Sequence, residues 1–112
     1  MNGVWQEEAK LVPTDGASGD RFGYDVALSG DTAIIGSPDD DDKGDNSGSG
    51  YVYTKIDGKW IENVKIVPEN GATYDLFGYS VAISGSTALF GASNGGEENG
   101  GSVYIVDDLC VP

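Results

Sequence analysis

The chain has 112 residues, with 19 acidic residues, 6 basic residues and no histidine, which gives a formal net charge of −13 at pH 7. This length allows one ordinary domain with a modest core. The charge repels nucleic acid and anionic lipid, which bind clustered lysine and arginine. Glycine occurs 18 times, about twice its usual share, which favours a β-rich chain with many turns.

No apolar stretch approaches the roughly 20 residues of a membrane-spanning helix, so membrane insertion is not expected. Residues 1–8 contain no basic segment followed by an apolar one, and no signal peptide is therefore visible. The single cysteine, Cys110, excludes an internal disulfide.

The sequence repeats itself with an offset of 55 residues. Trp5 matches Trp60, and the stretch 22–38 returns as 77–93. Each copy has two strand-like runs around a Ser-Gly-Asp or Ser-Gly-Ser turn, in which glycine stands where a two-residue hairpin needs a positive φ. The offset falls to 51 after the second strand, because the first copy has the longer loop there.

Four strand-like runs are expected in the first copy, at residues 23–29, 32–36, 50–55 and 59–67. Asp57-Gly58 is a strong hairpin signal between the last two runs, and Pro68 ends the fourth because it cannot extend a ladder. A repeat of this length with four strands is typical of a β-propeller blade. Repeat 1 then spans about residues 5–59 and repeat 2 about 60–112.

The predicted fold class is all-β: two four-stranded antiparallel blades of a partial propeller. The order is permuted by one strand, because residues 5–12 match a fourth strand while the last run, 102–106, matches a third. Known propellers have about four to eight blades, so two blades cannot close a ring. The chain either belongs to a longer array of repeats or assembles with copies of itself.

These residues resemble the FG-GAP repeat. The Phe-Gly pairs are Phe22-Gly23 and Phe77-Gly78, and the Gly-Ala-Pro element is imperfect in both Gly36-Ser37-Pro38 and Gly91-Ala92-Ser93. The match is similar to the long-period form in tandem arrays of bacterial, algal and other microbial proteins, which are typically secreted or surface-attached. The same repeat builds the seven-bladed propeller of integrin alpha subunits. The resemblance implies an extracellular or cell-surface adhesion module with a protein or glycan partner.

The acidic loop 39–48 is the strongest candidate metal site. Calcium takes six to eight oxygen ligands, which aspartates at alternate positions of a glycine-containing loop can supply. The candidate ligands are Asp39, Asp41, Asp42 and Asp45. Lys43 stands where a ligand belongs, and the integrin calcium loop lies between the first two strands, where this chain is too short. A solvated acidic turn is the alternative.

The matched aromatic and glycine residues are interpreted as structural. They are Trp5, Trp60, Phe22, Phe77, Gly23, Gly78, Gly36, Gly91 and Pro38. Each copy places the same ring in the same position, which favours packing between blades over a ligand-stacking platform. Lys10 and Lys65 fall in fourth strands, the outermost of a blade, where lysine discourages edge-to-edge association; we interpret them in that way and not as binding residues.

The sequence offers no catalytic constellation. Without histidine, neither a Ser-His-Asp triad nor a His-ligated zinc site can form, and no phosphate-binding motif is present. We therefore expect a non-catalytic binding or adhesion module that presents acidic loops to a protein or glycan partner, assisted by calcium. The alternatives are a structural blade pair that completes a propeller by homo-oligomerisation, and an accessory propeller of a larger secreted enzyme.

Overall fold

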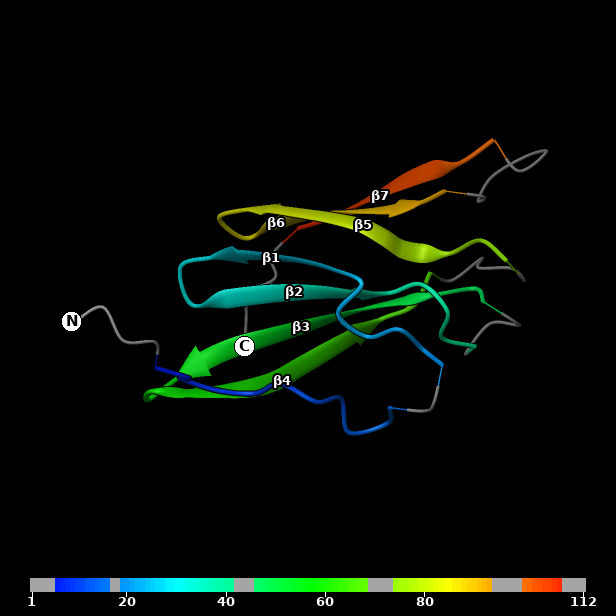
Figure 1. The fold of residues 1–112 in the computed structure, drawn as a ribbon. Helices are drawn as coiled ribbons and strands as arrows, with labels where there is room; N and C mark the ends of the chain where they lie inside the picture. Colours follow the sequence, from blue (N-terminus) through cyan, green and yellow to red (C-terminus); the bar gives the residue numbers. More distant parts are fainter. Residues whose placement is uncertain (1–5, 17–18, 42–45, 69–73, 94–99, 108–112) are drawn as a thin grey trace.

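The computed structural model consists of two antiparallel β-sheets and describes residues 6–16, 19–41, 46–68, 74–93 and 100–107 (Figure 1). The first sheet has the order β1 (Asp25–Ser29), β2 (Thr32–Ser37), β3 (Ser49–Ile56) and β4 (Lys59–Ile66). The second has the order β5 (Phe77–Ser84), β6 (Thr87–Ala92) and β7 (Ser102–Val106). The predicted all-β class is confirmed, and the described residues contain no helix and so none that could cross a membrane.

Two-residue turns join strands at one end of the molecule, which we call the hairpin end. Gly30 and Gly85 have φ angles of 57° and 59° at the first turn position between β1 and β2 and between β5 and β6. Asp57 and Gly58, between β3 and β4, are both positive at 53° and 80°. Positive φ values of this kind match the turn to the twist of the strands, so local sequence determines these hairpins.

The longer connections leave the strands at the opposite end, which we call the connection end (Figure 1). Ser37 pairs with Ser49 there, and Ala92 pairs with both Phe77 and Ser102. Residues 38–48, 67–76 and 93–101 therefore all begin and finish at this end.

Each sheet has two faces, set by the alternation of side chains along its strands. The face that carries Phe22 in the first sheet and Phe77 in the second is called the Phe face. The opposite face, which carries Gly36 in the first sheet and Gly91 in the second, is called the Gly face. The Gly face of the first sheet packs against the Phe face of the second, and the core between them includes Ile34, Val52, Phe77, Ala88, Phe90 and Ala92.

The two sheets come closest where the Phe-Gly pair of the second repeat meets the glycines of the first. A side chain on Gly36 would overlap the carbonyl group of Gly78, and a side chain on Gly50 would overlap the ring of Phe90. The amide of Phe77 donates a hydrogen bond of 2.9 Å to the carbonyl oxygen of Ser47, and the Phe77 and Phe90 rings stack 5.1 Å apart. Backbone therefore lies directly on backbone at this point.

The N-terminal segment differs from the expected strand over residues 5–12. Its described part, from Gln6, contains no strand and crosses the Phe face of the first sheet, where Leu11 packs with Tyr51 and its neighbours. The indole of Trp60 donates a hydrogen bond of 2.8 Å to Glu8. The segment has no neighbouring third strand to pair with, so it forms no ladder. The second sheet accordingly has three strands where four were expected.

We predict that Gly36→Ala destabilises the chain by about 1–3 kcal/mol, because the new methyl group forces the two backbones apart. The matched control is Gly91→Ala, at the equivalent position of the second sheet. A side chain there approaches only the hydroxyl of Ser80, which can rotate away, so we expect a change within about 0.5 kcal/mol. Urea unfolding of both variants in dilute, monomeric samples measures the difference, and equal losses would contradict the close contact.

Candidate functional site

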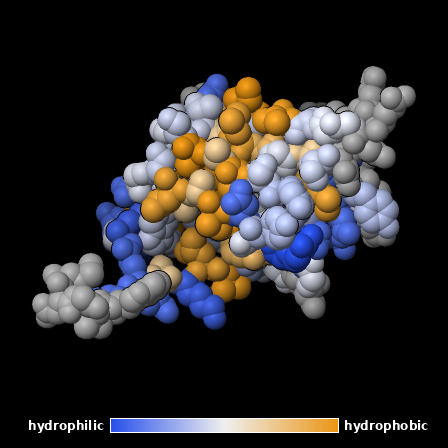
Figure 2. All heavy atoms as spheres, turned by 45° about the horizontal axis from the view of Figure 1, so that its top comes forward, coloured by the Kyte–Doolittle hydropathy of each residue, from blue (hydrophilic) through white to orange (hydrophobic). Residues whose placement is uncertain are grey.

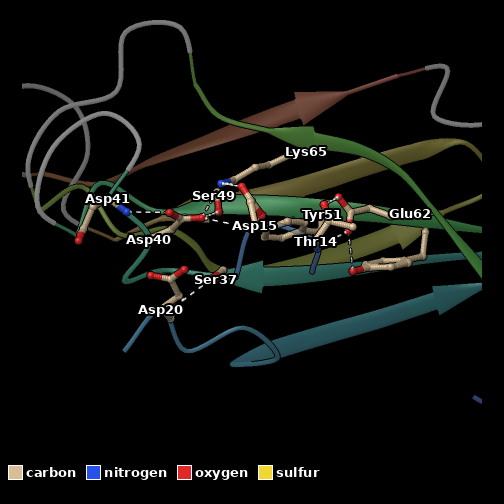
Figure 3. Close-up of polar contacts among 11 residues, drawn as sticks. Thr14, Asp15, Asp20, Ser37, Asp40, Asp41, Ser49, Tyr51, Glu62 and Lys65 are labelled. Atoms are coloured by element: carbon tan, nitrogen blue, oxygen red, sulfur yellow. Dashed lines mark hydrogen bonds and ion pairs between the residues drawn. The ribbon is translucent and has the colours of Figure 1, made fainter. Parts of the chain in front are cut away.

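A cluster of five polar side chains lies at the connection end (Figure 3). The ammonium group of Lys65 lies 2.6 Å from a carboxylate oxygen of Asp15 and 2.8 Å from one of Asp40. The hydroxyl of Tyr51 donates to the same two carboxylates at 2.8 Å and 3.2 Å. The hydroxyl of Ser49 donates to Asp40 at 2.7 Å. One lysine and two hydroxyls thus satisfy two carboxylates.

The strands of the first sheet place these groups together. Tyr51 and Lys65 are register partners on β3 and β4, so their side chains leave the same face. Ser49 is the first residue of β3, and Asp40 follows β2 in a turn in which its amide donates to the carbonyl oxygen of Ser37 at 3.2 Å. Only 5% of the surface of Asp40 is exposed, so it cannot lose its partners without being left as an unpaired buried charge.

Asp15 comes from the N-terminal segment, which Glu62 of β4 fixes in place. The amide and hydroxyl of Thr14 donate to the two carboxylate oxygens of Glu62 at 3.0 Å and 3.1 Å. The hydroxyl of Tyr53 donates to the same carboxylate at 3.2 Å. Polar contacts therefore hold the residues before β1 on the Phe face of the first sheet, which is the face away from the second sheet.

The cluster shifts the ionisation of its members. The hydrogen bond from Lys65 is the largest influence on Asp15 and holds its pKa below the ordinary value of 3.8. Burial alone would raise the pKa of Asp40, but hydrogen bonds from Lys65 and Ser49 outweigh it, so the net shift is downward. Burial, reinforced by the hydrogen bond to Asp15, raises the pKa of Tyr51. Both carboxylates are charged and the phenol is neutral at pH 7.

The structure describes two of the four predicted calcium ligands. Asp39 forms a two-point ion pair with the guanidinium of Arg21, and Asp41 accepts a hydrogen bond of 2.8 Å from the amide of Asn46. Asp42 and Asp45 lie outside the described residues. Among the residues that the structure does describe, no group of three or more acidic or cysteine side chains is arranged to hold a metal ion. Calcium binding by these four residues stays a prediction.

Two exposed tyrosines extend the polar surface beside Arg21. The rings of Tyr24 and Tyr79, which follow the two Phe-Gly pairs, lie 5.0 Å apart. The guanidinium of Arg21 lies 4.6 Å from the centre of the Tyr24 ring, within the range of a cation–π contact. Tyr24 is 44% exposed and Tyr79 is 39% exposed. The repeat therefore places a pair of accessible aromatic rings near the connection end.

Most of the other predicted motif residues pack within or between the sheets, whereas Gly23 is exposed and Gly91 lines a hollow on the second sheet. Phe22 packs edge-on against Tyr51 with ring centres 5.1 Å apart, and Trp60 packs on the same face. Pro38 is fully buried. Trp5 lies outside the described residues.

Sequence reasoning missed the role of Lys65. We interpreted it as an edge lysine facing solvent, but its side chain is only 16% exposed and pairs with Asp15 and Asp40. The predicted hairpin of β3 and β4 was a partial signal. It makes Lys65 a neighbour of Tyr51, and Tyr51 also contacts the acidic loop through Asp40. The loop contact itself joins residues 25 positions apart, which no local pattern reveals.

Comparison with protein families agrees with this architecture. The model of the FG-GAP repeat matches residues 5–53 and again residues 60–106. The chain belongs to the FG-GAP repeat family. No curated protein matches it. As an FG-GAP repeat protein it is a β-propeller-type module, and its two sheets are consistent with partial propeller blades, with no closed sheet among the described strands.

We predict that Lys65→Met costs this FG-GAP module about 2–3 kcal/mol of stability, because it leaves Asp40 buried without its cation. Adding Asp40→Asn to Lys65→Met should recover part of the loss, since the uncompensated charge is then removed. Lys10→Met is the control: Lys10 is the matched lysine of the other repeat and is exposed, so we expect a change within about 0.5 kcal/mol. Thermal or urea unfolding of the four proteins gives the comparison.

Acid should remove the contribution of the cluster. The pKa of Asp40 is lower in the folded chain than its ordinary value of 3.8, so the unfolded chain takes up its proton first as pH falls. The contribution is therefore complete above about pH 5 and is lost below about pH 4. The stability difference between the wild type and Asp40→Asn should be constant from pH 7 to 5 and shrink below that. A difference that does not change down to pH 2 would be inconsistent with a lowered pKa.

Proposed function

We propose that this FG-GAP module is a non-catalytic binding module that acts outside the cell or at its surface. Its connection end contacts a cationic group of a protein or glycan partner. The location is proposed from the family alone. The observation that carries the binding role is the unequal distribution of charge between the two ends of the sheets.

The three connections that leave the strands at the connection end contain nine acidic residues, divided five, two and two in chain order, and one basic residue, Lys43. The basic side chains described at this end are already neutralised: Arg21 pairs with Asp39, and Lys65 pairs with Asp15 and Asp40. The acidic residues of these connections therefore outnumber the basic ones, which leaves this end with a net negative charge. A field of one sign speeds the association of an oppositely charged ligand.

The tyrosine pair supports the same end as a contact surface. Tyr24 and Tyr79 offer apolar ring faces with polar hydroxyls, a combination that is enriched in binding interfaces. The guanidinium of Arg21 lies over the ring of Tyr24. Carboxylates for charge and rings for stacking are what recognition of a basic peptide or a glycan requires.

Calcium enters this proposal as a bridging ion at the loop 39–48. Aspartate oxygens suit its coordination, but Asp39 would have to release Arg21 to serve as a ligand. Binding of calcium should therefore compete with the ion pair and free the guanidinium for other contacts.

The structure also supports a second candidate function, a structural unit that completes a propeller by associating with further repeats. Its support is the Gly face of the second sheet, on which Leu89, Val103 and Ile105 are exposed. No described part of the chain pairs with the outer edge of β7.

We predict that a decapeptide of lysine, labelled for fluorescence anisotropy, binds the wild-type chain and that half-molar salt weakens the binding. Asp41→Asn/Asp42→Asn/Asp45→Asn removes three charges from the connection end and should weaken it at least about tenfold. The charge-matched control, Asp31→Asn/Asp57→Asn/Asp107→Asn, removes three charges from the hairpin end and should change the affinity less than about threefold. Equal losses would show that only net charge matters and would overturn the assignment of the connection end.

The same assay tests the role of calcium. A calcium ion bound by the loop would repel the lysine peptide, so millimolar calcium should weaken binding by the wild type and leave Asp39→Asn/Asp41→Asn unaffected. An identical response of the two proteins would remove calcium from the proposal and leave the acidic surface in place.

A further inference from the structure

The Gly face of the second sheet is an open apolar surface. Val103 is 64% exposed and Ile105 is 69% exposed, beside Leu89 at 41%. A hollow lined by Ser80, Gly91, Gly101 and other residues lies on this side of the sheet. Figure 2, in which the top of Figure 1 is brought forward, shows apolar side chains gathered across this side of the molecule. An apolar surface of this kind marks an interaction site.

The first sheet shows what covers such a face. Gly91 is the repeat equivalent of Gly36, which lies under Gly78. The strand pairing aligns β7 with β3 at an offset of 53, so Val103, the register partner of Gly91, stands where Gly50 pairs with Gly36 under the ring of Phe90. The equivalent of the Ile34–Val52 pair is Leu89 and Ile105. The covered face and the open face therefore share the glycine of the second strand and an apolar pattern, and the occupant of the first is the Phe face of an FG-GAP repeat.

The Phe face of the first sheet has the features of the Phe face that covers the first sheet's own Gly face, and no other described sheet packs on it. Gly23 has a φ angle of 91°, almost the 90° of Gly78, yet no atom lies within 4 Å of the position that its side chain would take. Val26 and Leu28 on the same face are 60% and 65% exposed. Their equivalents in the second repeat, Val81 and Ile83, pack into the core between the sheets.

The edge of β7 lacks the strand that completes the first sheet. β3 pairs with β4, whereas β7, its equivalent, pairs only with β6 among the described strands. Beside this edge, Ile61 and Val64 of β4 point toward the second sheet but stay 47% and 43% exposed. A fourth strand would cover them and pair with the outer edge of β7, because an edge strand invites pairing with another chain.

Residues 6–12 are the repeat equivalent of β4. They share Glu7, Lys10 and Val12 with Glu62, Lys65 and Val67. By contrast, the residues after Val106 do not continue the repeat: Cys110 and Val111 stand where the turn residues Asp57 and Gly58 are found when β7 is aligned with β3 by strand pairing. The segment of this chain that fits the edge of β7 is therefore the one that precedes β1. In its own molecule it crosses the first sheet, on the side away from β7 (Figure 1).

We propose that a second copy of this chain completes the second sheet. Residues 6–12 of that copy pair antiparallel with β7, and its Phe face packs on the Gly face of the second sheet. The register follows from β3 and β4, in which Val52 pairs with Val64. Ile105 is the equivalent of Val52 by strand pairing, so this register places Ala9 of the second copy opposite Ile105. This inference rests on the second candidate function, the completion of a propeller by association. It adds that the partner is a second copy of this chain and says which surfaces meet.

The contact is head-to-tail, because the two surfaces that meet are different, and such contacts repeat until a ring closes. Known propellers have about four to eight blades, so two to four copies would close one. The segment has to leave its present position, where its fixed contacts include Glu8 with Lys55 and Trp60. Exposed contacts of this kind are weak, so the release of the segment costs little free energy.

Sedimentation of the 112-residue chain tests the association. We expect species of two to four times the chain mass of 11.6 kDa. Ile105→Asp should weaken association about tenfold or more, because it places a charge in the apolar contact. Tyr74→Asp adds the same charge at a residue that is 57% exposed and outside both surfaces, so association should persist. A wild type that stays monomeric at high concentration would overturn both the inference and the second candidate function, leaving the acidic-end proposal intact.

Cross-linking tests the register. Two proteins, Ile105→Cys and Ala9→Cys, both with Cys110→Ser, are mixed and oxidised, and a disulfide-linked heterodimer is expected. Ile105→Cys mixed with Lys10→Cys is the control, because Lys10 would point to the opposite face of the same strand. Association without the first cross-link, or equal cross-linking of both pairs, would overturn the proposed strand pairing. The copies would then associate through a different contact.

Discussion

The stacking of the two sheets depends on one contact between backbones. Gly36 and Gly78 bring the first strand of one repeat against the second strand of the other, with no room for a side chain between them. The amides of Phe77 and Leu76 donate to Ser47 and Asn46 across the same junction. The Phe-Gly pair and the later glycine are therefore two halves of one interface that belong to successive repeats, which explains why both occur in each copy.

Both repeats carry the Phe-Gly pair, but in the described part of this chain only the pair of the second repeat packs against another sheet. The Phe-Gly pair of the second copy lies in the core, while Gly23 of the first faces open space with the same positive φ. Gly36 is covered, and its equivalent Gly91 lies beside a hollow. The backbone conformation of Gly23 thus does not need the neighbour that fits it, so it is set within the repeat, where the Gly23 amide donates to the carbonyl oxygen of Gly36.

Most of the fold could be predicted because its determinants are local or repeated. Gly30, Gly85 and the Asp57-Gly58 pair encode the hairpins, and the duplication identifies equivalent strands. What the sequence could not show depends on contacts distant along the chain. Lys65 looks like an edge lysine until the turn after β2 brings Asp40 beside it. Residues 6–12 carry the pattern of a strand but have no ladder to join in their own sheet. The pattern therefore predicted a strand where the structure has none.

The charge and the stacking surfaces occupy different parts of the molecule, and their energies are nevertheless linked. Apolar faces build the stack, while the acidic connections lie at one end of every sheet. Head-to-tail stacking would align these ends side by side and bring like charges together. Their repulsion decays over about 8 Å at physiological ionic strength, which is close to the roughly 10 Å spacing of packed sheets, so it would be weakened but not abolished. A cationic ligand or calcium at the connection end would relieve this repulsion, and by linkage it would bind an assembled stack more tightly than a single chain.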